Sequence, residues 1–221
     1  MSSPRRRRGY VPRQVRLMRT IAVVLAVVGG VLVVGDLRSR AGMDVALGAL
    51  PPATPCQPGS PTRMSIPAIG VDAPVETIGL DRRGTLDASG RAPLAAPVDQ
   101  RKVGWFAEGP KPGSGTGTVL TNGHTYRDGS AVFQQDFSTR IQVGQEIDLV
   151  LDNGSTCRYR VTTVWRDVDA ATGYPQLVAD QGLYDQTGPE RLFLETCSGP
   201  WLSSERRFED ISVVLATPVA T

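Results

Sequence analysis

The fold of this 221-residue chain is decided by two segments, Gln145-Glu-Ile-Asp-Leu-Val-Leu151 and Cys157-Arg-Tyr-Arg-Val-Thr-Thr-Val-Trp165. In each of them apolar residues alternate with polar ones, which is the pattern of a β-strand with one buried face. Asp152-Asn-Gly154 lies between them and favours the tight turn of a hairpin. The stretch therefore predicts two antiparallel strands joined by a short turn.

Other short apolar stretches are separated by Gly, Pro, Asp and Asn. We expect strands at Arg63-Met-Ser-Ile-Pro-Ala-Ile69, Thr118-Val-Leu-Thr121, Arg191-Leu-Phe-Leu-Glu-Thr196 and Ile211-Ser-Val-Val-Leu-Ala216. Short helical turns are expected near Ala131–Phe137 and Pro175–Gly182. Many short strands in one domain of this size predict a mainly β fold, with the strands in a closed or nearly closed barrel.

The N-terminus predicts a membrane anchor. Residues 1–19 carry seven Arg and no acid, and an uncharged apolar run follows from Thr20 to Gly35. We predict a cytoplasmic tail over 1–19 and a single-pass transmembrane signal anchor over 20–37, with the folded domain outside the cell membrane. A cleaved signal peptide is the alternative, but Asp36, Arg38 and Arg40 stand where small residues should mark a cleavage site.

A proline-rich segment separates the anchor from the folded domain. Residues 51–61 contain five prolines, so we predict an extended extracytoplasmic tether over 38–60 and one domain over 61–221. The whole chain has 24 basic and 22 acidic residues; without the seven N-terminal Arg, 17 basic residues face 22 acids. The domain is mildly acidic, so its net charge does not imply a nucleic-acid-binding surface.

The three cysteines leave two possibilities open. Cys56 lies in the tether and Cys157 in the predicted hairpin, so a disulfide between them would leave Cys197 reduced. Three free thiols are the alternative. A structural zinc site is disfavoured because one His and three scattered Cys lack closely spaced ligand pairs.

His124 is the only histidine of the chain, and Cys197 ends the hydrophobic stretch Leu192-Phe-Leu-Glu-Thr. A thiol becomes a good nucleophile when a neighbouring group helps it lose its proton, and imidazole is suited to this task. Any Cys–His chemistry must therefore use His124. A buried structural thiol and a solvated loop histidine are the alternative interpretations.

Together these residues resemble a known family. The order of anchor, tether, Arg63-Met-Ser-Ile-Pro-Ala-Ile-Gly-Val-Asp-Ala-Pro-Val75, Thr121-Asn-Gly-His-Thr125, Leu194-Glu-Thr-Cys197 and a late Arg is similar to the sortases. The resemblance covers residues 61–217 and is closest to the actinobacterial class F, with class E next. It implies a closed eight-stranded sortase-type β-barrel with one or two short helices.

The sequence departs from the family pattern at two places. Tyr126 stands where the family often has an aspartate two residues after the histidine. Near the C-terminus the common Arg-Tyr-x-Asp-Asn pattern is replaced by Arg207-Phe-Glu-Asp-Ile, preceded by a second arginine, Arg206. The identity of the catalytic arginine is therefore open between these two, with Arg207 favoured because it aligns without a gap.

The resemblance implies a cysteine transpeptidase that cleaves a C-terminal sorting motif of the Leu-Pro-x-Thr-Gly kind in secreted proteins. Cys197 would form a thioacyl intermediate, His124 would transfer protons, and Arg207 would donate hydrogen bonds to the oxyanion. Thr196 would support the site, or serve only as a β-branched strand residue. The acceptor would be an amine of a peptidoglycan precursor, and no cofactor is expected.

Two other functions remain as alternatives. A degenerate sortase-like domain would bind peptide or cell-wall material without turnover. An L,D-transpeptidase would carry a histidine close before its cysteine, whereas Leu-Glu-Thr precedes Cys197 here. The latter reading is therefore disfavoured.

Overall fold

The computed structural model of the protein describes residues 56–84 and 92–219. The predicted cytoplasmic tail, the signal anchor and most of the tether lie outside these residues. Among the helices of the described part, none is long and apolar enough to cross a membrane. The strands are β1 (Pro61–Ile66), β2 (Val71–Ile78), β3 (Val103–Phe106), β4 (Thr118–Gly123), β5 (Glu146–Leu151), β6 (Thr156–Asp169), β7 (Arg191–Leu202) and β8 (Arg207–Pro218). The helices are η1 (Pro67–Ile69), α2 (Phe137–Arg140) and α3 (Gly173–Asp180).

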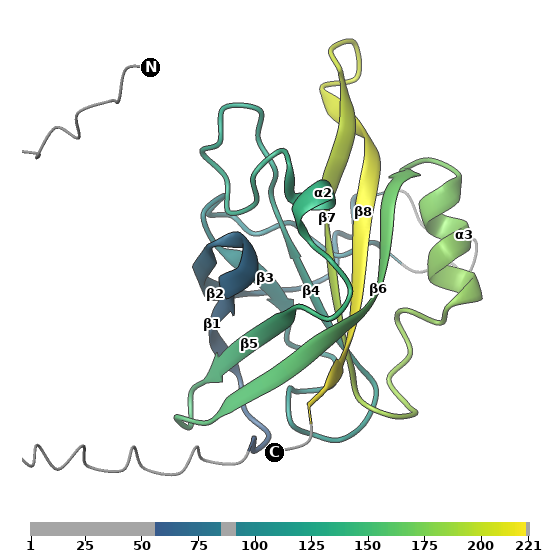
Figure 1. Ribbon diagram of the computed structural model, residues 1–221. Helices are drawn as coiled ribbons and strands as arrows, with labels where there is room; N and C mark the ends of the chain where they lie inside the picture. Colours follow the sequence, from purple (N-terminus) through teal and green to yellow (C-terminus); the bar gives the residue numbers. More distant parts are fainter. Residues whose placement is uncertain (1–55, 85–91, 220–221) are drawn as a thin grey trace, which may run out of the picture. The chain divides into compact units, whose positions relative to one another are not determined.

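The eight strands close into a barrel in the order β1-β2-β3-β4-β7-β8-β6-β5 (Figure 1). The pairs β2–β3 and β4–β7 are parallel, and the other pairs are antiparallel. Closure leaves the strands without a long free edge. The prediction of a mainly β, closed eight-stranded barrel is confirmed.

The predicted hairpin is β5 and β6. Its register pairs Ile147 with Tyr159 and Leu149 with Cys157, and these four inward-facing side chains are all buried. Alternation thus predicted both the pairing and the buried face. β6 continues four residues beyond Trp165, because it also pairs with β8 along its second half.

The local structure differs from the sequence predictions at three places. The first strand ends at Ile66 because Pro67, which has no N–H for a ladder, begins the 3-10 turn η1. Gly70, at φ 73°, then turns the chain into β2. β2 and β3 were not predicted as strands; β3 is four residues long and entirely buried, so it shows no alternation. The helical turn expected at 131–137 begins only at Phe137, whereas α3 overlaps its predicted range.

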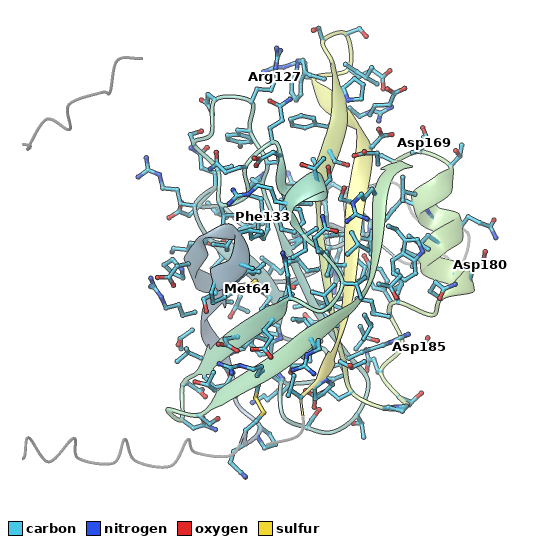
Figure 2. All side chains as sticks on the ribbon, in the orientation of Figure 1. Met64, Arg127, Phe133, Asp169, Asp180 and Asp185 are labelled. Atoms are coloured by element: carbon cyan, nitrogen blue, oxygen red, sulfur yellow. A yellow bond between two sulfur atoms is a disulfide. The ribbon has the colours of Figure 1, made fainter. Side chains whose placement is uncertain are left out.

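Apolar side chains pack on both sides of the barrel wall. Inside, Met64 and Phe133 are fully buried in the main core cluster; both are labelled in Figure 2. Outside, a second cluster joins Val178 of α3 to Phe193 of β7 and Leu120 of β4. The outer face of β4 and β7 is therefore partly covered by packed apolar side chains. The candidate site lies on this face.

A disulfide joins Cys56 to Cys157 of β6. Of the two possibilities left open by the sequence, the structure has the bridge, and Cys197 is free. The bonded residues are 101 positions apart, and closing a loop of this length stabilises a domain by on the order of 4–5 kcal/mol. The bridge therefore fixes the start of the domain to the barrel.

Candidate active site

Cys197 lies within β7 and not at its end. The strand continues to Leu202 because its pairing with β8 resumes after a bulge between Ser198 and Trp201. Side chains alternate along β7, so Thr196 points into the barrel and Cys197 points outward on the same face as Phe193. Cys197 is exposed and carries a free thiol, so the interpretation as a buried structural thiol is wrong.

His124 follows directly after β4. The parallel ladder between β4 and β7 pairs Gly123 with Thr196, so the next residue of each strand is His124 on one side and Cys197 on the other. Adjacent strands are about 4.8 Å apart, and the two residues are therefore neighbours. The fold brings the single histidine beside the free cysteine.

The His124 ring is held by the segment before β3. Its Nε2 lies 2.9 Å from the carbonyl oxygen of Pro97. A carbonyl can only accept, so Nε2 carries the proton and a neutral ring keeps its lone pair on Nδ1. The ring is partly buried and its centroid lies 5.4 Å from that of Tyr126, the residue that departs from the family pattern.

Thr196 ties these neighbours together. Its buried hydroxyl donates to the carbonyl oxygen of Gly123 at 2.8 Å and lies 2.7 Å from the hydroxyl of Thr125. Since the single hydroxyl proton of Thr196 is donated to the carbonyl oxygen of Gly123, the hydroxyl of Thr125 is the donor in the second contact. The residue before Cys197 is thus hydrogen-bonded to the residues on both sides of His124.

The two arginines lie farther away, at the β7–β8 hairpin. β8 begins at Arg207, which pairs with Leu202, whereas the residue opposite Cys197 is Ile211. Arg207 and Ile211 share one face of β8 but are separated by four residues, about 13 Å. This hairpin extends beyond the other strands at the top of Figure 1.

The guanidinium of Arg207 is engaged locally. It forms an ion pair with Glu205 at 2.7 Å and donates to the carbonyl oxygen of Phe208 at 3.1 Å. Arg206 is exposed in the turn with a φ of 55°. In this arrangement neither guanidinium has a recorded contact with Cys197.

The electrostatics of the site are set by a carboxylate that the sequence reasoning missed. Burial raises the pKa of Glu195, two residues before Cys197, to about 7. Desolvation raises the pKa of the Cys197 thiol, and the negative charge of Glu195 raises it further. Cys197 therefore rests as a neutral thiol near pH 7. A glutamate within an otherwise apolar strand was the signal in the sequence.

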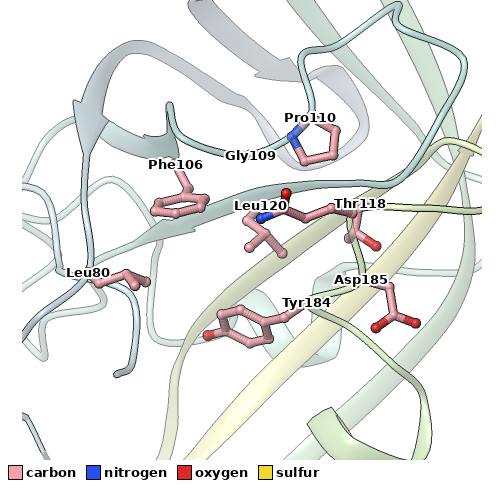
Figure 3. A pocket seen from close by; sticks show the side chains of 9 residues that line it. Leu80, Phe106, Gly109, Pro110, Thr118, Leu120, Tyr184 and Asp185 are labelled. Carbon is pink, nitrogen blue, oxygen red and sulfur yellow. The ribbon is translucent and has the colours of Figure 1, made fainter. Parts of the chain in front are cut away.

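A pocket of about 250 Å³ lies on the same outer face, farther along β4 (Figure 3). Leu80, Phe106, Leu120 and Tyr184 give it an apolar lining, and Asp185 stands at one side. Leu120 precedes His124 by four residues, which is about 13 Å along the strand.

One wall of this pocket is held by Glu190, also missed from the sequence. Its buried carboxylate accepts hydrogen bonds from the backbone N–H groups of Gly113 and Gly115 at 3.0 and 2.5 Å. The hydroxyl of Tyr159 donates to it at 2.5 Å. These contacts fix the loop between β3 and β4, which supplies Gly109 and Pro110 to the pocket.

Within residues 56–84 and 92–219, no group of three or more His, Cys, Asp or Glu side chains is placed to hold a metal ion. The chemistry that these residues themselves offer is nucleophilic. A solvent-accessible thiol stands beside an imidazole, at one end of a surface that holds an apolar pocket.

Comparison with known proteins identifies the family of the chain. The family model described as the sortase domain matches residues 64–219. The chain belongs to the sortase family. No curated protein sequence matches the chain.

Solved sortases share the fold at low sequence identity. Sortase C1 from Streptococcus suis is 16% identical, with a TM-score of 0.50 over 74% of this chain and 74% of that one. Sortase C-1 from Actinomyces oris is 19% identical, with a TM-score of 0.49 over 72% and 71%. Sortase A from Corynebacterium diphtheriae is 18% identical, with a TM-score of 0.49 over 75% and 63%. These matches leave the class within the sortase family undetermined.

Proposed function

We propose that this sortase is a membrane-anchored cysteine transpeptidase that cleaves a C-terminal sorting motif of the Leu-Pro-x-Thr-Gly kind and transfers the acyl group to a cell-wall amine. The observation that carries the proposal is the parallel pairing of Gly123 with Thr196, which sets His124 beside the free, exposed Cys197. The other two cysteines are joined in a disulfide. Cys197 is therefore the single thiol available for catalysis.

In the first half-reaction the sulfur of Cys197 attacks the carbonyl carbon of the Thr–Gly bond. The thiol proton passes to the free Nδ1 of His124, a C–S bond forms, and the C–N bond breaks. His124 then gives this proton to the departing amine. In the second half-reaction an incoming amine attacks the thioester and loses a proton to His124. The C–S bond breaks, and the proton returns to the sulfur.

Arg207 is the proposed donor to the oxyanion and to substrate carbonyls, with Arg206 as the alternative. Arg207 lies on the Cys197 face of β8, and its rigid, permanently charged guanidinium suits this role. It must exchange its partner Glu205 for the substrate. We propose that the hairpin moves toward Cys197 when the peptide binds.

The pocket in Figure 3 is the proposed place for the apolar residue that opens the motif. In an extended peptide a leucine three residues before the threonine lies about 10 Å from it, and Leu120 of the pocket lining lies about 13 Å from His124 along the same chain segment. The apolar lining by Phe106 and Leu120 suits that side chain.

The test is turnover of a sorting-motif peptide in the presence of an amine, followed by mass analysis of the products. Wild-type protein is expected to give both the cleaved fragment and the amine adduct. Cys197→Ala and His124→Ala should give neither, while circular dichroism shows the barrel retained. Acyl transfer that persists in Cys197→Ala would refute the proposal.

A degenerate domain that only binds peptide or cell-wall material is the alternative. The exposure of Cys197 argues against it, because a vestigial thiol has no need of access to solvent. Turnover separates the two: the proposed enzyme cleaves the peptide, and it loses this activity with the rate constant at which a methanethiosulfonate probe modifies Cys197. A protein that binds the peptide but shows no turnover before modification would support the alternative.

The anchor over residues 20–37 and the outward orientation of the domain remain proposals from the sequence. Fractionation of cells that express the full chain, or a chain starting at residue 56, tests them. The full chain should resist extraction from membranes by alkaline carbonate, and the shortened one should not.

A further inference from the structure

Glu195 is a carboxylate placed directly behind the candidate nucleophile. It stands on the same face of β7 as Cys197 and two residues before it, about 7 Å along the strand. Its neighbours on either side in the strand, Leu194 and Thr196, point into the barrel. A charged residue here needs a reason, because partial burial of a carboxylate is costly.

The contacts of Glu195 join three parts of the fold. The hydroxyl of Tyr174 in α3 donates to its carboxyl group, and Asn122 of β4 is paired with Glu195 across the parallel ladder. Asn122 in turn donates to the carbonyl oxygen of Ala95 at 3.0 Å. The segment that carries Ala95 continues to Pro97, whose carbonyl oxygen holds His124. Glu195 thus links the nucleophile strand to the support of the histidine.

The groups named here around Glu195 are uncharged near neutral pH. Tyr174 comes from α3, and Tyr184, 3.2 Å from the Tyr174 hydroxyl, comes from the segment after it. β8 contributes Val213 opposite Glu195, β4 contributes Asn122, and β7 contributes the thiol itself. No ion pair of Glu195 with a basic side chain is found in the described part of the chain. Desolvation raises the pKa of Glu195 to about 7, although the neighbouring Tyr174 and Asn122 side chains lower it.

We propose that Glu195 is a positioning residue of the transpeptidase site, which braces the wall behind Cys197 and, when it ionises, opposes the loss of the thiol proton. This inference rests on the proposed function for its biological meaning. Its physical content concerns the reactivity of Cys197 alone. A neutral Glu195 braces the site without this effect, and an ionised one raises the pKa of the thiol.

The test is the rate of alkylation of Cys197 by iodoacetamide between pH 5.5 and 9, in wild type, Glu195→Gln and a control. Glu146→Gln is the matched control, because Glu146 is a partly exposed carboxylate of β5 that pairs with Arg160, away from Cys197. The disulfide protects the other two cysteines. No peptide substrate is needed, so the result stands whether or not the protein proves to be a transpeptidase.

At pH 6, below the pKa of Glu195, wild type and Glu195→Gln should react equally. At pH 8.5 the variant should react faster by on the order of 3- to 10-fold, the effect of removing one charge at this separation. The wild-type profile should also bend near pH 7, and the Glu146→Gln profile should match it. A rate ratio that is the same at both pH values, or equal to one throughout, would overturn the proposal.

If Glu195→Gln does not fold by circular dichroism, Tyr174→Phe takes its place. It removes a hydrogen bond that lowers the pKa of Glu195, so the bend in the profile should move to higher pH. A bend that stays at the wild-type pH would contradict the proposed role of Glu195.

Discussion

Thr196 donates a hydrogen bond to the carbonyl oxygen of Gly123 at 2.8 Å, across the parallel ladder that joins β7 to β4. Each of these residues directly precedes a member of the proposed catalytic pair. The bond therefore fixes the relative height of His124 and Cys197 along their strands. A slip of the ladder by one residue would turn one of the two side chains to the other face.

Replacing Thr196 by Val should harm both stability and catalysis. The change keeps the shape but leaves the carbonyl of Gly123 and the hydroxyl of Thr125 without their buried partner, at a cost of about 1–3 kcal/mol. Urea denaturation measures the stability, and peptide turnover measures the activity. Thr121→Val is the matched control, because the buried Thr121 hydroxyl also donates to a carbonyl oxygen of the β4–β7 ladder, that of Phe193, at 2.7 Å. It should lose similar stability and keep more activity; equal loss of activity in both variants would contradict the special role of Thr196.

Reduction of the Cys56–Cys157 disulfide should lower the melting temperature without removing the thiol chemistry. The bridge closes a loop of about 100 residues, and its loss should cost on the order of 4–5 kcal/mol. Thermal unfolding with and without dithiothreitol measures the difference. A Cys197→Ala protein should show the same difference, because Cys197 takes no part in the bridge. A melting temperature that does not respond to reductant would contradict the structural role of the bridge.

Stability should depend on pH through Glu195. Its pKa in the folded protein is about 7, above its ordinary value. As the pH falls, the folded protein therefore binds this proton at a higher pH than the unfolded chain does. The stabilisation from this proton is present at low pH and is lost as pH rises through 7. The free energy of unfolding of Glu195→Gln minus that of wild type should therefore increase by on the order of 2 kcal/mol from pH 5 to pH 8.5. Melting temperatures at the two pH values test this, and an unchanged difference would count against it.

Arg207 and Arg206 should differ in their effect on turnover. Arg207→Ala removes the guanidinium on the Cys197 face of β8 and should slow acyl transfer by on the order of 100-fold. Arg206→Ala should have little effect, because Arg206 lies exposed in the turn. Glu205→Gln is informative as well, because it frees Arg207 from its ion pair and should not slow the reaction. If Arg206→Ala slows acyl transfer more than Arg207→Ala does, Arg206 is the oxyanion donor and the assignment to Arg207 is wrong.

Much of the fold follows from local patterns. The alternation of Ile147 and Leu149 with polar neighbours predicts the β5–β6 hairpin and its buried face. The parallel ladder of β4 and β7 has no such signal, because it joins segments about 70 residues apart through tertiary packing alone. β3 escapes recognition because its four residues are buried on both faces.

The candidate site was predictable in its chemistry but not in its geometry. His124 and Cys197 were identified as the pair from residue type and family resemblance. The distance of Arg207 from Cys197 was not, because a bulge between Ser198 and Trp201 sets the register of the hairpin. The role of Glu195 also depends on Tyr174 and Asn122, which only the folded chain brings to its carboxyl group.

The most direct test of the central claim is the intact mass of the protein after brief mixing with a sorting-motif peptide and no added amine. The account predicts a gain equal to the acyl part of the peptide, mapped by proteolysis to Cys197, released by hydroxylamine and absent from Cys197→Ala. An acyl group found on another residue would contradict the account. So would cleavage of the peptide by wild type without any acylated protein.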